Sequence, residues 1–230
     1  MKNYFKILIL LLLVKSECVA QQNSQLFRFY ENAKVGYKDQ NNTIVVPATY
    51  YAGSEFVDGF AVIVNNNKRG YINNKGEVAI PLKFEDAGPF KNGLAKVMLS
   101  KKYGYINTKG DWVIEPQYDY AEDFSEGLAM VKFNGIFGYI NNTGKLVIAL
   151  QYKSAQNFSN GLAAVKFNNG KWGYINYKNA VIIHARYTTA TPFTAAGKAI
   201  VSIGVEYYTI DRKGRFKEKL KVFEDREKGD

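Results

Sequence analysis

Two short phrases recur along this chain at a nearly constant spacing, and this period constrains the fold more than any other feature. The first phrase, Gly-Tyr-Ile-Asn, is repeated in steps of 34, 34 and 35 residues, beginning at Gly70, Gly104, Gly138 and Gly173. The second phrase, Phe-x-x-Gly-Leu/Phe-Ala, is repeated in steps of 34 residues, beginning at Phe56, Phe90, Phe124 and Phe158. A fixed period in this range is typical of tandem arrays in which each unit packs on its neighbours.

Each unit contains three segments that have the character of short β-strands. The first follows the glycine of the Phe-x-x-Gly phrase, over residues 60–64, 94–98, 128–132 and 162–166. The second is the Gly-Tyr-Ile-Asn phrase, and the third covers residues 78–80, 112–114, 146–148 and 181–183. The segments are rich in Val and Ile, and turns of Asn, Lys and Gly separate them, as in β-hairpins. No stretch has a long 3.6-residue apolar period, so we expect at most a turn of helix.

These observations predict an all-β fold of tandem repeats of about 34 residues, each a short three-stranded antiparallel unit. We expect the units to stack in an elongated superhelical array, with a closed propeller-like ring as the alternative. The repeat domain is predicted over residues 26–215, in about six units of which the terminal ones are degenerate caps. Residues 21–25 are predicted to be a disordered lead. Residues 216–230 form a charged C-terminal tail that either covers the open end or is disordered.

The N-terminus has the pattern of a secretory signal peptide over residues 1–20. A basic leader precedes the apolar run 7–14, and Cys18-Val19-Ala20 places small residues before the expected cleavage point. The apolar run is too short to cross a bilayer, which takes roughly 20 residues. Lipid anchoring through Cys18 is the less favoured alternative, because polar residues precede it. We therefore expect an exported protein of the periplasm, cell surface or extracellular space, with no transmembrane span after cleavage.

Export and charge together limit the expected chemistry and partners. Cys18 is the only cysteine, so the mature chain can form neither a disulfide framework nor a thiolate metal site. The net charge of +10 falls to about +8 when the signal is removed. Behind an export signal, this charge favours an acidic polymer, lipid head groups or an acidic envelope or extracellular protein as partner, and makes nucleic acid unlikely.

The Gly-Tyr-Ile-Asn phrase, together with the residue before it, resembles the motif of WG-repeat proteins, a bacterial family named for a Trp-Gly pair. Residues 172–176 carry Trp-Gly-Tyr-Ile-Asn in full, while Arg69-Gly70, Tyr103-Gly104 and Phe137-Gly138 keep the glycine and replace the tryptophan. The resemblance covers about residues 26–215. It implies a β-rich binding or scaffolding repeat, and it supplies no catalytic residues.

The residues that carry catalysis in other proteins are sparse and isolated in this sequence. The single histidine, His184, cannot by itself build a metal site. Most acidic residues fall in the connections between units and have no counterpart in neighbouring units, as expected of solvated loops. The alternative to a binding module is therefore a carbohydrate-active enzyme using loop carboxylates such as Asp119 and Asp123, which would have to face each other across one cleft.

Aromatic and basic residues are the remaining candidates. The Tyr and Phe that recur in every unit are best explained as core residues, because a unit of this length cannot bury its apolar face alone. Trp112 and Trp172 have no match in the other units and are better candidates for a surface site. Equivalent turn positions form rows along an array, and one row could bind an acidic chain through Lys75, Lys109, Lys178 and Lys213.

The sequence thus predicts a non-enzymatic, exported repeat module for protein or polymer binding or scaffolding in the bacterial envelope. No cofactor and no metal is expected. The same lysines also serve the simpler purpose of keeping turns soluble, so the binding residues Trp112, Trp172 and the lysine row remain hypotheses.

Overall fold

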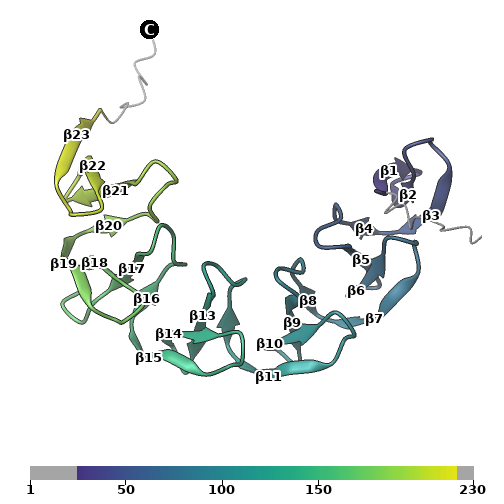
Figure 1. Cartoon of the computed structure of the whole chain (residues 1–230), viewed down its shortest axis with the longest axis horizontal. Coiled ribbons are helices and arrows are strands. Elements are labelled where there is room, and N and C mark those ends of the chain that lie inside the picture. The colour runs from purple at the N-terminus through teal and green to yellow at the C-terminus, as the bar shows by residue number, and fades with distance from the viewer. Residues whose placement is uncertain (1–24, 222–230) are drawn as a thin grey trace, which may run out of the picture.

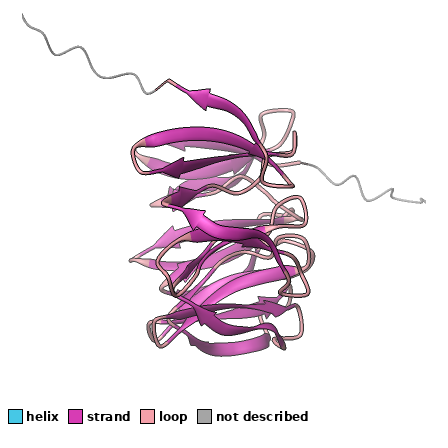
Figure 2. Ribbon diagram, turned by 90° about the vertical axis from the view of Figure 1, so that its left-hand side faces the viewer, coloured by secondary structure: helices cyan, strands magenta, loops and turns pink. Residues whose placement is uncertain are grey.

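The computed structural model describes residues 25–221 as a curved, open array of six small antiparallel sheets (Figure 1). The sheets follow one another in chain order around an arc whose two ends do not meet. Strands and loops make up the whole of the described part of the chain (Figure 2). The predicted signal peptide and nearly all of the predicted lead lie outside the described residues.

The first sheet has three strands and each later sheet has four. The first three sheets contain β1 (Phe27–Glu31), β2 (Lys34–Lys38), β3 (Ile44–Tyr50); β4 (Ala52–Gly53), β5 (Phe60–Asn65), β6 (Lys68–Asn73), β7 (Val78–Phe84); and β8 (Asp86–Ala87), β9 (Leu94–Leu99), β10 (Lys102–Asn107), β11 (Trp112–Tyr118). The last three contain β12 (Tyr120–Ala121), β13 (Leu128–Phe133), β14 (Ile136–Asn141), β15 (Leu146–Tyr152); β16 (Ser154–Ala155), β17 (Ala163–Lys166), β18 (Trp172–Ile175), β19 (Val181–Tyr187); and β20 (Thr189–Ala190), β21 (Lys198–Ile203), β22 (Glu206–Asp211), β23 (Phe216–Leu220).

The predicted all-β repeat fold is confirmed, and the open array is the form observed. The structure adds a fourth strand of two residues, β4, β8, β12, β16 or β20, which the sequence analysis placed in the connections between units. This strand lies on the concave side of the arc, and the long outer strands β3, β7, β11, β15, β19 and β23 lie on its convex side (Figure 1).

In each of the first five sheets, a glycine packs the strand before the outer strand tightly against that outer strand. A Cβ atom at Gly104 would lie 2.4 Å from the carbonyl oxygen of Ile114, and one at Gly138 would lie 2.7 Å from that of Ile148. Both distances are shorter than a real Cβ contact allows, so only glycine fits. Each outer strand also has a register shift opposite this glycine. The repeated glycine of Gly-Tyr-Ile-Asn is therefore a packing requirement.

The tyrosine of the same phrase forms the core between neighbouring sheets. Its side chain is fully buried in the four complete copies and in the degenerate first copy: Tyr71, Tyr105, Tyr139, Tyr174 and Tyr37. The ring packs on the Phe of the next sheet; the Tyr139 and Phe158 centroids are 4.9 Å apart. Because a buried hydroxyl needs a partner, each phenol donates to a backbone carbonyl of the next sheet, over 2.6 Å from Tyr105 to Glu122 and 2.9 Å from Tyr37 to Ser54. We call these five residues the tyrosine ladder.

The tyrosine ladder ends at the last sheet, where polar residues occupy positions that are apolar or aromatic in the preceding sheets. Thr209 stands where the preceding sheets have the ladder tyrosine, and it pairs with Glu218 where Tyr174 pairs with Ile183. Lys198 is exposed in the position that Leu162 occupies, buried, in the fifth sheet. A polar outer face is what a terminal repeat needs for solubility. The sixth sheet is thus a cap, as the degenerate sequence predicted.

The C-terminal boundary of the repeat domain differs from the prediction. Residues 216–220 were assigned to a charged tail, but they form β23, the outer strand of the last sheet. Their alternation of charged residues resembles a tail in sequence because this strand lies at the end of the array, where one face has no neighbouring sheet to pack on. The domain therefore runs to Leu220, and residues 222–230 lie outside the described part of the chain.

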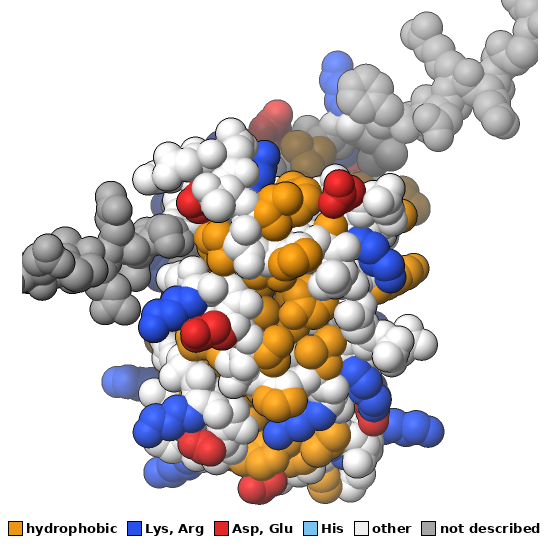
Figure 3. All heavy atoms as spheres, turned by 90° about the vertical axis from the view of Figure 1, so that its right-hand side faces the viewer, with side chains coloured by type: hydrophobic (Ala, Val, Ile, Leu, Met, Phe, Trp, Pro, Cys, Tyr) orange, Lys and Arg blue, Asp and Glu red, His pale blue; other side chains and the backbone are white. Residues whose placement is uncertain are grey.

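The convex side exposes pairs of apolar residues at the start of the outer strands. On the side of β3 and β7, hydrophobic side chains gather along the middle of the face (Figure 3). Ile44, Val45 and Val78, at the start of these two outer strands, are among the exposed apolar residues. The outer strands are sheet edges, which are prone to pair with other chains. Bulges, and Pro47, Pro81 and Pro116, reduce that tendency because proline cannot donate a ladder hydrogen bond.

Candidate functional site

The predicted lysine row occupies equivalent turns. The backbone N–H of Lys75, Lys109 and Lys178 donates to an asparagine side-chain oxygen over 2.9–3.0 Å, and that of Lys213 to Asp211 in the same way. The turn therefore fixes the backbone and leaves the lysine side chains exposed. None of the four takes part in an ion pair with another residue of the described region. Thr143 interrupts the row in the fourth sheet.

Other basic residues near the second strands are partly neutralised. Arg69 pairs with Asp86 over 3.6 Å and donates to the backbone carbonyl of Glu85. Lys102 forms an ion pair with Asp119. The lysine row in the turns, by contrast, presents positive charge without an ion pair in the described region at four equivalent positions.

The two tryptophans pack within the array rather than forming an exposed platform. Trp112 is half-buried on the outer strand β11, with its ring edge-on to Phe84 at a centroid distance of 5.9 Å. Trp172 is half-buried and packs against the core between the last two sheets, which includes Tyr187. The structure brings neither together with the lysine row into one cavity.

Asp119 and Asp123 lie at the two ends of the short strand β12. Asp119 accepts the backbone N–H of Asn134 over 2.7 Å, and its hydrogen bond from Lys102 is the main cause that lowers the pKa of its carboxyl group. Glu85 and Thr188 make the same kind of contact to the corresponding hairpins. Asp123 instead pairs with Lys91 over 3.4 Å. Asp119 therefore supports a turn, and the two carboxyl groups are not brought together.

The other residues that could bind a metal or act in catalysis are also scattered over residues 25–221. His184 is exposed on β19. No group of three or more His, Cys, Asp or Glu side chains in this region could hold a metal ion. Across the same residues, no helix is long and apolar enough to cross a membrane.

Two grooves lie on the concave side of the array. The first, of about 500 Å³, lies where the second and third sheets meet and is lined mainly by Ala52, Ser54, Val62, Val64, Ala87 and Pro89. We call it the apolar groove. The Arg28–Glu55 ion pair, at 3.0 Å, closes its N-terminal side.

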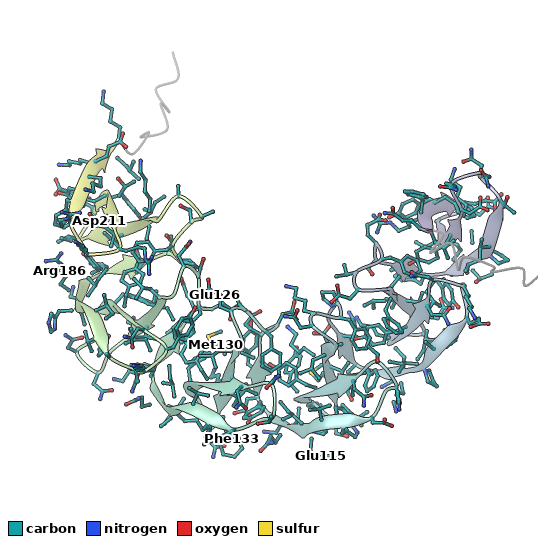
Figure 4. All side chains as sticks on the ribbon, viewed as in Figure 1. Glu115, Glu126, Met130, Phe133, Arg186 and Asp211 are labelled. Atoms are coloured by element: carbon teal, nitrogen blue, oxygen red, sulfur yellow. The ribbon has the colours of Figure 1, made fainter. Side chains whose placement is uncertain are left out.

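The second groove, of about 440 Å³, lies at the equivalent place between the fourth and fifth sheets. Its wall from β12–β15 carries Tyr120, Glu122, Met130 and Phe137, and its other wall carries Ala155, Gln156, Asn157 and Pro192. We call it the polar groove. Met130 lies between the inner strands of these sheets, whereas Glu115 and Phe133 lie on the convex side and Glu126 at the tip of a concave loop (Figure 4).

The grooves occupy the same places two repeats apart but differ in their side chains. Ala52, Ser54 and Val62 of the apolar groove stand where the polar groove has Tyr120, Glu122 and Met130. Between the third and fourth sheets the same places hold Asp86 and Lys96, each in contact with Tyr103. Sequence reasoning missed the grooves, although the residues two before the repeated Phe, which vary from Ser54 to Gly88, Glu122, Gln156 and Thr191, were a visible signal.

The tyrosine ladder holds the backbone of these variable residues. Tyr105 donates to the carbonyl of Glu122, and Tyr139 donates to the carbonyl of Gln156 over 2.6 Å. The side chains of the same two residues line the polar groove. The ladder therefore fixes where the groove wall lies, and leaves the side chain at that position free to vary.

Within the polar groove, most polar atoms are acceptors. The hydrogen bond that Tyr120 donates to Glu122 is the main cause that raises the pKa of Tyr120 to about 12. The side-chain amide of Gln156 donates to the carbonyl of Ala190 over 3.0 Å. The side-chain oxygens of Gln156 and Asn157 are buried and have no hydrogen-bond partner among the described residues. A buried acceptor of this kind normally finds a donor.

Comparison with known proteins identifies the family to which the repeats belong. The model of the family described as "WG containing repeat" matches residues 36–68, 70–103, 103–135, 137–172 and 172–204. The chain belongs to the WG-containing repeat family. Each matched WG repeat starts near the third strand of one sheet and ends near the hairpin of the next, so five sequence repeats connect six sheets. No curated protein matches this WG-repeat sequence.

Solved structures similar to this WG-repeat protein are β-propellers. A eukaryotic initiation factor matches with 10% identity and a TM-score of 0.55, over 85% of this chain and 63% of that chain. The computationally designed Ika8 protein matches with 10% identity and a TM-score of 0.53, over 85% and 71%. Hsv2p of Kluyveromyces lactis matches with 9% identity and a TM-score of 0.51, over 82% and 71%. At these identities the likeness concerns the fold: the six sheets are arranged as propeller blades in an arc that is open.

Proposed function

We propose that this protein is a non-enzymatic repeat module that binds a protein or a polymer along its arc. The observation that carries the proposal is the division between a constant frame and variable concave walls. The ladder tyrosines and packing glycines recur in successive sheets, whereas the residues whose carbonyls the ladder holds change from one sheet to the next. Propeller-like frames position ligands through such variable positions.

We further propose that the module acts outside the cytoplasm, in the bacterial envelope or beyond it, because the first 20 residues have the pattern of a signal peptide. An acidic polymer or an acidic protein is the partner that the excess of positive charge favours. The lysine row supports this choice, since its four side chains are exposed and without ion pairs in the described region.

Affinity capture from an envelope extract tests the proposed function, with the mature chain immobilised and heparin-agarose as a parallel polyanion probe. We expect a specific partner that elutes with salt, and retention on heparin that falls strongly between about 50 and 300 mM salt. The variant Lys75→Glu, Lys109→Glu should lose much of that retention. Lys68→Glu, Lys171→Glu is the matched control, because it removes the same charge from the hairpins at the other end of the strands.

Equal retention of both double variants on heparin would show that the lysine row does not bind the polyanion, and would remove it from the proposal.

The alternative, a carbohydrate-active enzyme, requires turnover of a glycan that disappears in Asp119→Asn or Asp123→Asn. The hydrogen bonds of Asp119 to Asn134 and Lys102 favour a structural role for that residue, so we expect no turnover and a small loss of stability in Asp119→Asn.

A further inference from the structure

We propose that the polar groove binds a neutral saccharide, a ligand class that rests on the proposed binding function and makes it more specific. The groove combines a flat hydrophobic wall with several hydrogen-bond acceptors. Tyr120, Met130 and Phe137 supply the wall, and Glu122, Gln156 and Asn157 supply the acceptors. Its volume of about 440 Å³ lies in the range of small-molecule sites, about 300–1,000 Å³.

The acceptors point to a ligand rich in hydroxyl groups. The Gln156 amide nitrogen donates to the Ala190 carbonyl and the Tyr120 hydroxyl donates to Glu122, so the oxygens of Glu122, Gln156 and Asn157 and the amide nitrogen of Asn157 remain for a ligand. The side-chain oxygens of Gln156 and Asn157 are buried and have no hydrogen-bond partner among the described residues. Hydroxyl groups of a sugar ring can supply donors at several of these points at once.

The charge around the groove disfavours the two charged alternatives. Lys132 lies opposite Tyr120 in the sheet, and its Nζ sits 5.3 Å from the centre of the Phe137 ring. An ammonium ligand would find that aromatic face already occupied by a cation. An anionic ligand would meet the Glu122 carboxylate and two further oxygens. A neutral ring whose C–H face lies on Tyr120 meets neither objection.

The frame makes the site rigid on both walls. The carbonyls of Glu122 and Gln156 accept ladder hydrogen bonds from Tyr105 and Tyr139. The Tyr120 ring also packs edge-on against Tyr103 of the third sheet, with centroids 6.1 Å apart. Preformed walls limit the ordering cost of binding. The apolar groove has the same frame but presents Ala52, Ser54 and Val62, and we expect it not to bind the same ligand.

A printed array of neutral oligosaccharides tests the proposal with the mature chain. The array should include gluco-, manno-, galacto- and N-acetylhexosamine series in both anomeric linkages, and a Lys-rich and an acidic peptide as charged probes. We expect at least one neutral glycan to bind, and titration calorimetry with that glycan to show about tenfold or greater weakening in Phe137→Ala and in Gln156→Ala. Val62→Ala is the matched control in the apolar groove, and its affinity should stay within about twofold of the unchanged chain.

Three results would overturn the saccharide site. They are binding to no neutral glycan, binding only to a charged peptide, and glycan binding that Phe137→Ala and Gln156→Ala leave unchanged. Melting curves of each variant identify a loss that arises from unfolding, in which case Tyr120→Ala, at a side chain that is 37% exposed, decides the outcome: the proposal requires it to weaken glycan binding. Capture of an envelope partner that is insensitive to Phe137→Ala would leave the proposed binding function standing while this inference fails.

Discussion

The apolar and polar grooves have the same place in the repeat, the same ladder hydrogen bonds behind them and different side chains. In the first, the ladder holds the carbonyl of Ser54; in the second, it holds the carbonyls of Glu122 and Gln156. The backbone geometry is therefore independent of what lines the cavity. This comparison shows how a repeat of this kind can vary its binding chemistry without changing its fold.

The ladder works because a tyrosine can be buried and still satisfy its hydroxyl group across the joint between sheets. The ring supplies the apolar area that a 34-residue unit needs from its neighbour, and the phenol pairs with a carbonyl that would otherwise face the core unpaired. The joints between sheets thus depend on the ladder, and the groove walls depend on the joints. Mutations in the ladder and in the grooves should consequently have opposite patterns of effect.

The largest expected effect is on stability, in Tyr139→Ala compared with Tyr120→Ala. Tyr139 is fully buried, so its removal leaves a cavity and an unpaired Gln156 carbonyl, and should cost about 3–5 kcal/mol of unfolding free energy. Tyr120 is 37% exposed, and its removal should cost below about 1 kcal/mol. Urea denaturation measures both. Similar costs for the two would break the distinction between frame and groove.

Substitutions at two glycines distinguish the cost of disturbing close packing from the cost of a strained backbone conformation. Gly138→Ala would push a Cβ atom against the Ile148 carbonyl, 2.7 Å away, and should cost about 3 kcal/mol or prevent folding. Gly135 has a φ of 82° but open space around its Cβ position, so Gly135→Ala should cost about 1 kcal/mol. Thermal melts would compare them. A reversed order would show that the approach of β14 to β15 does not constrain the chain.

The ladder also predicts a loss of stability in alkali. Burial raises the pKa of Tyr71, Tyr105 and Tyr139 well above the ordinary value of 10. The folded state therefore keeps protons that the unfolded state releases above pH 10, so stability is complete below pH 10 and falls as the pH rises beyond it. Melting temperatures between pH 8 and 11 should show this fall. Tyr139→Phe should make it shallower, and an unchanged slope would contradict the assignment.

A smaller effect sharpens the role of Asp119. Asp119→Asn keeps an acceptor for the backbone N–H of Asn134 but loses the ion pair with Lys102, and should lower stability only slightly at pH 7 because the pair is solvent-exposed. Lys102→Gln should have a similar effect, and the double variant should cost little more than either single one. Additive costs in denaturant titrations would show that the two side chains act independently.

The constant part of this molecule could be predicted from the sequence and the variable part could not. Gly-Tyr-Ile-Asn repeats in register, so the three main strands and the burial of Tyr71 or Tyr105 follow from the period. The inner strands could not be found, because a pair such as Asp86-Ala87 has neither the length nor the β-branched residues of a strand signal. β23 was missed because the outward face of a terminal sheet carries charges that resemble a tail.

The grooves were beyond sequence reasoning for a related reason. Each forms mainly from residues of two sheets that are distant in sequence, such as Tyr120 and Asn157, which are 37 positions apart, and no period relates their side chains. The tryptophans, chosen because they have no counterparts, are half-buried and pack against Phe84 and against the core that includes Tyr187, and their role in binding stays a prediction. Differences between repeats are therefore informative only when the position of the difference on the frame is known.

Exchange of one groove wall for the other tests the account most directly. In this variant Tyr120, Glu122 and Met130 take the identities of their counterparts in the apolar groove, as Tyr120→Ala, Glu122→Ser and Met130→Val, and the array-selected glycan is titrated by calorimetry. The account predicts that binding is lost while the melting temperature falls by only about 5–10 °C, because the ladder is untouched. Retained affinity in this variant would contradict the claim that the variable wall on a constant frame carries the function.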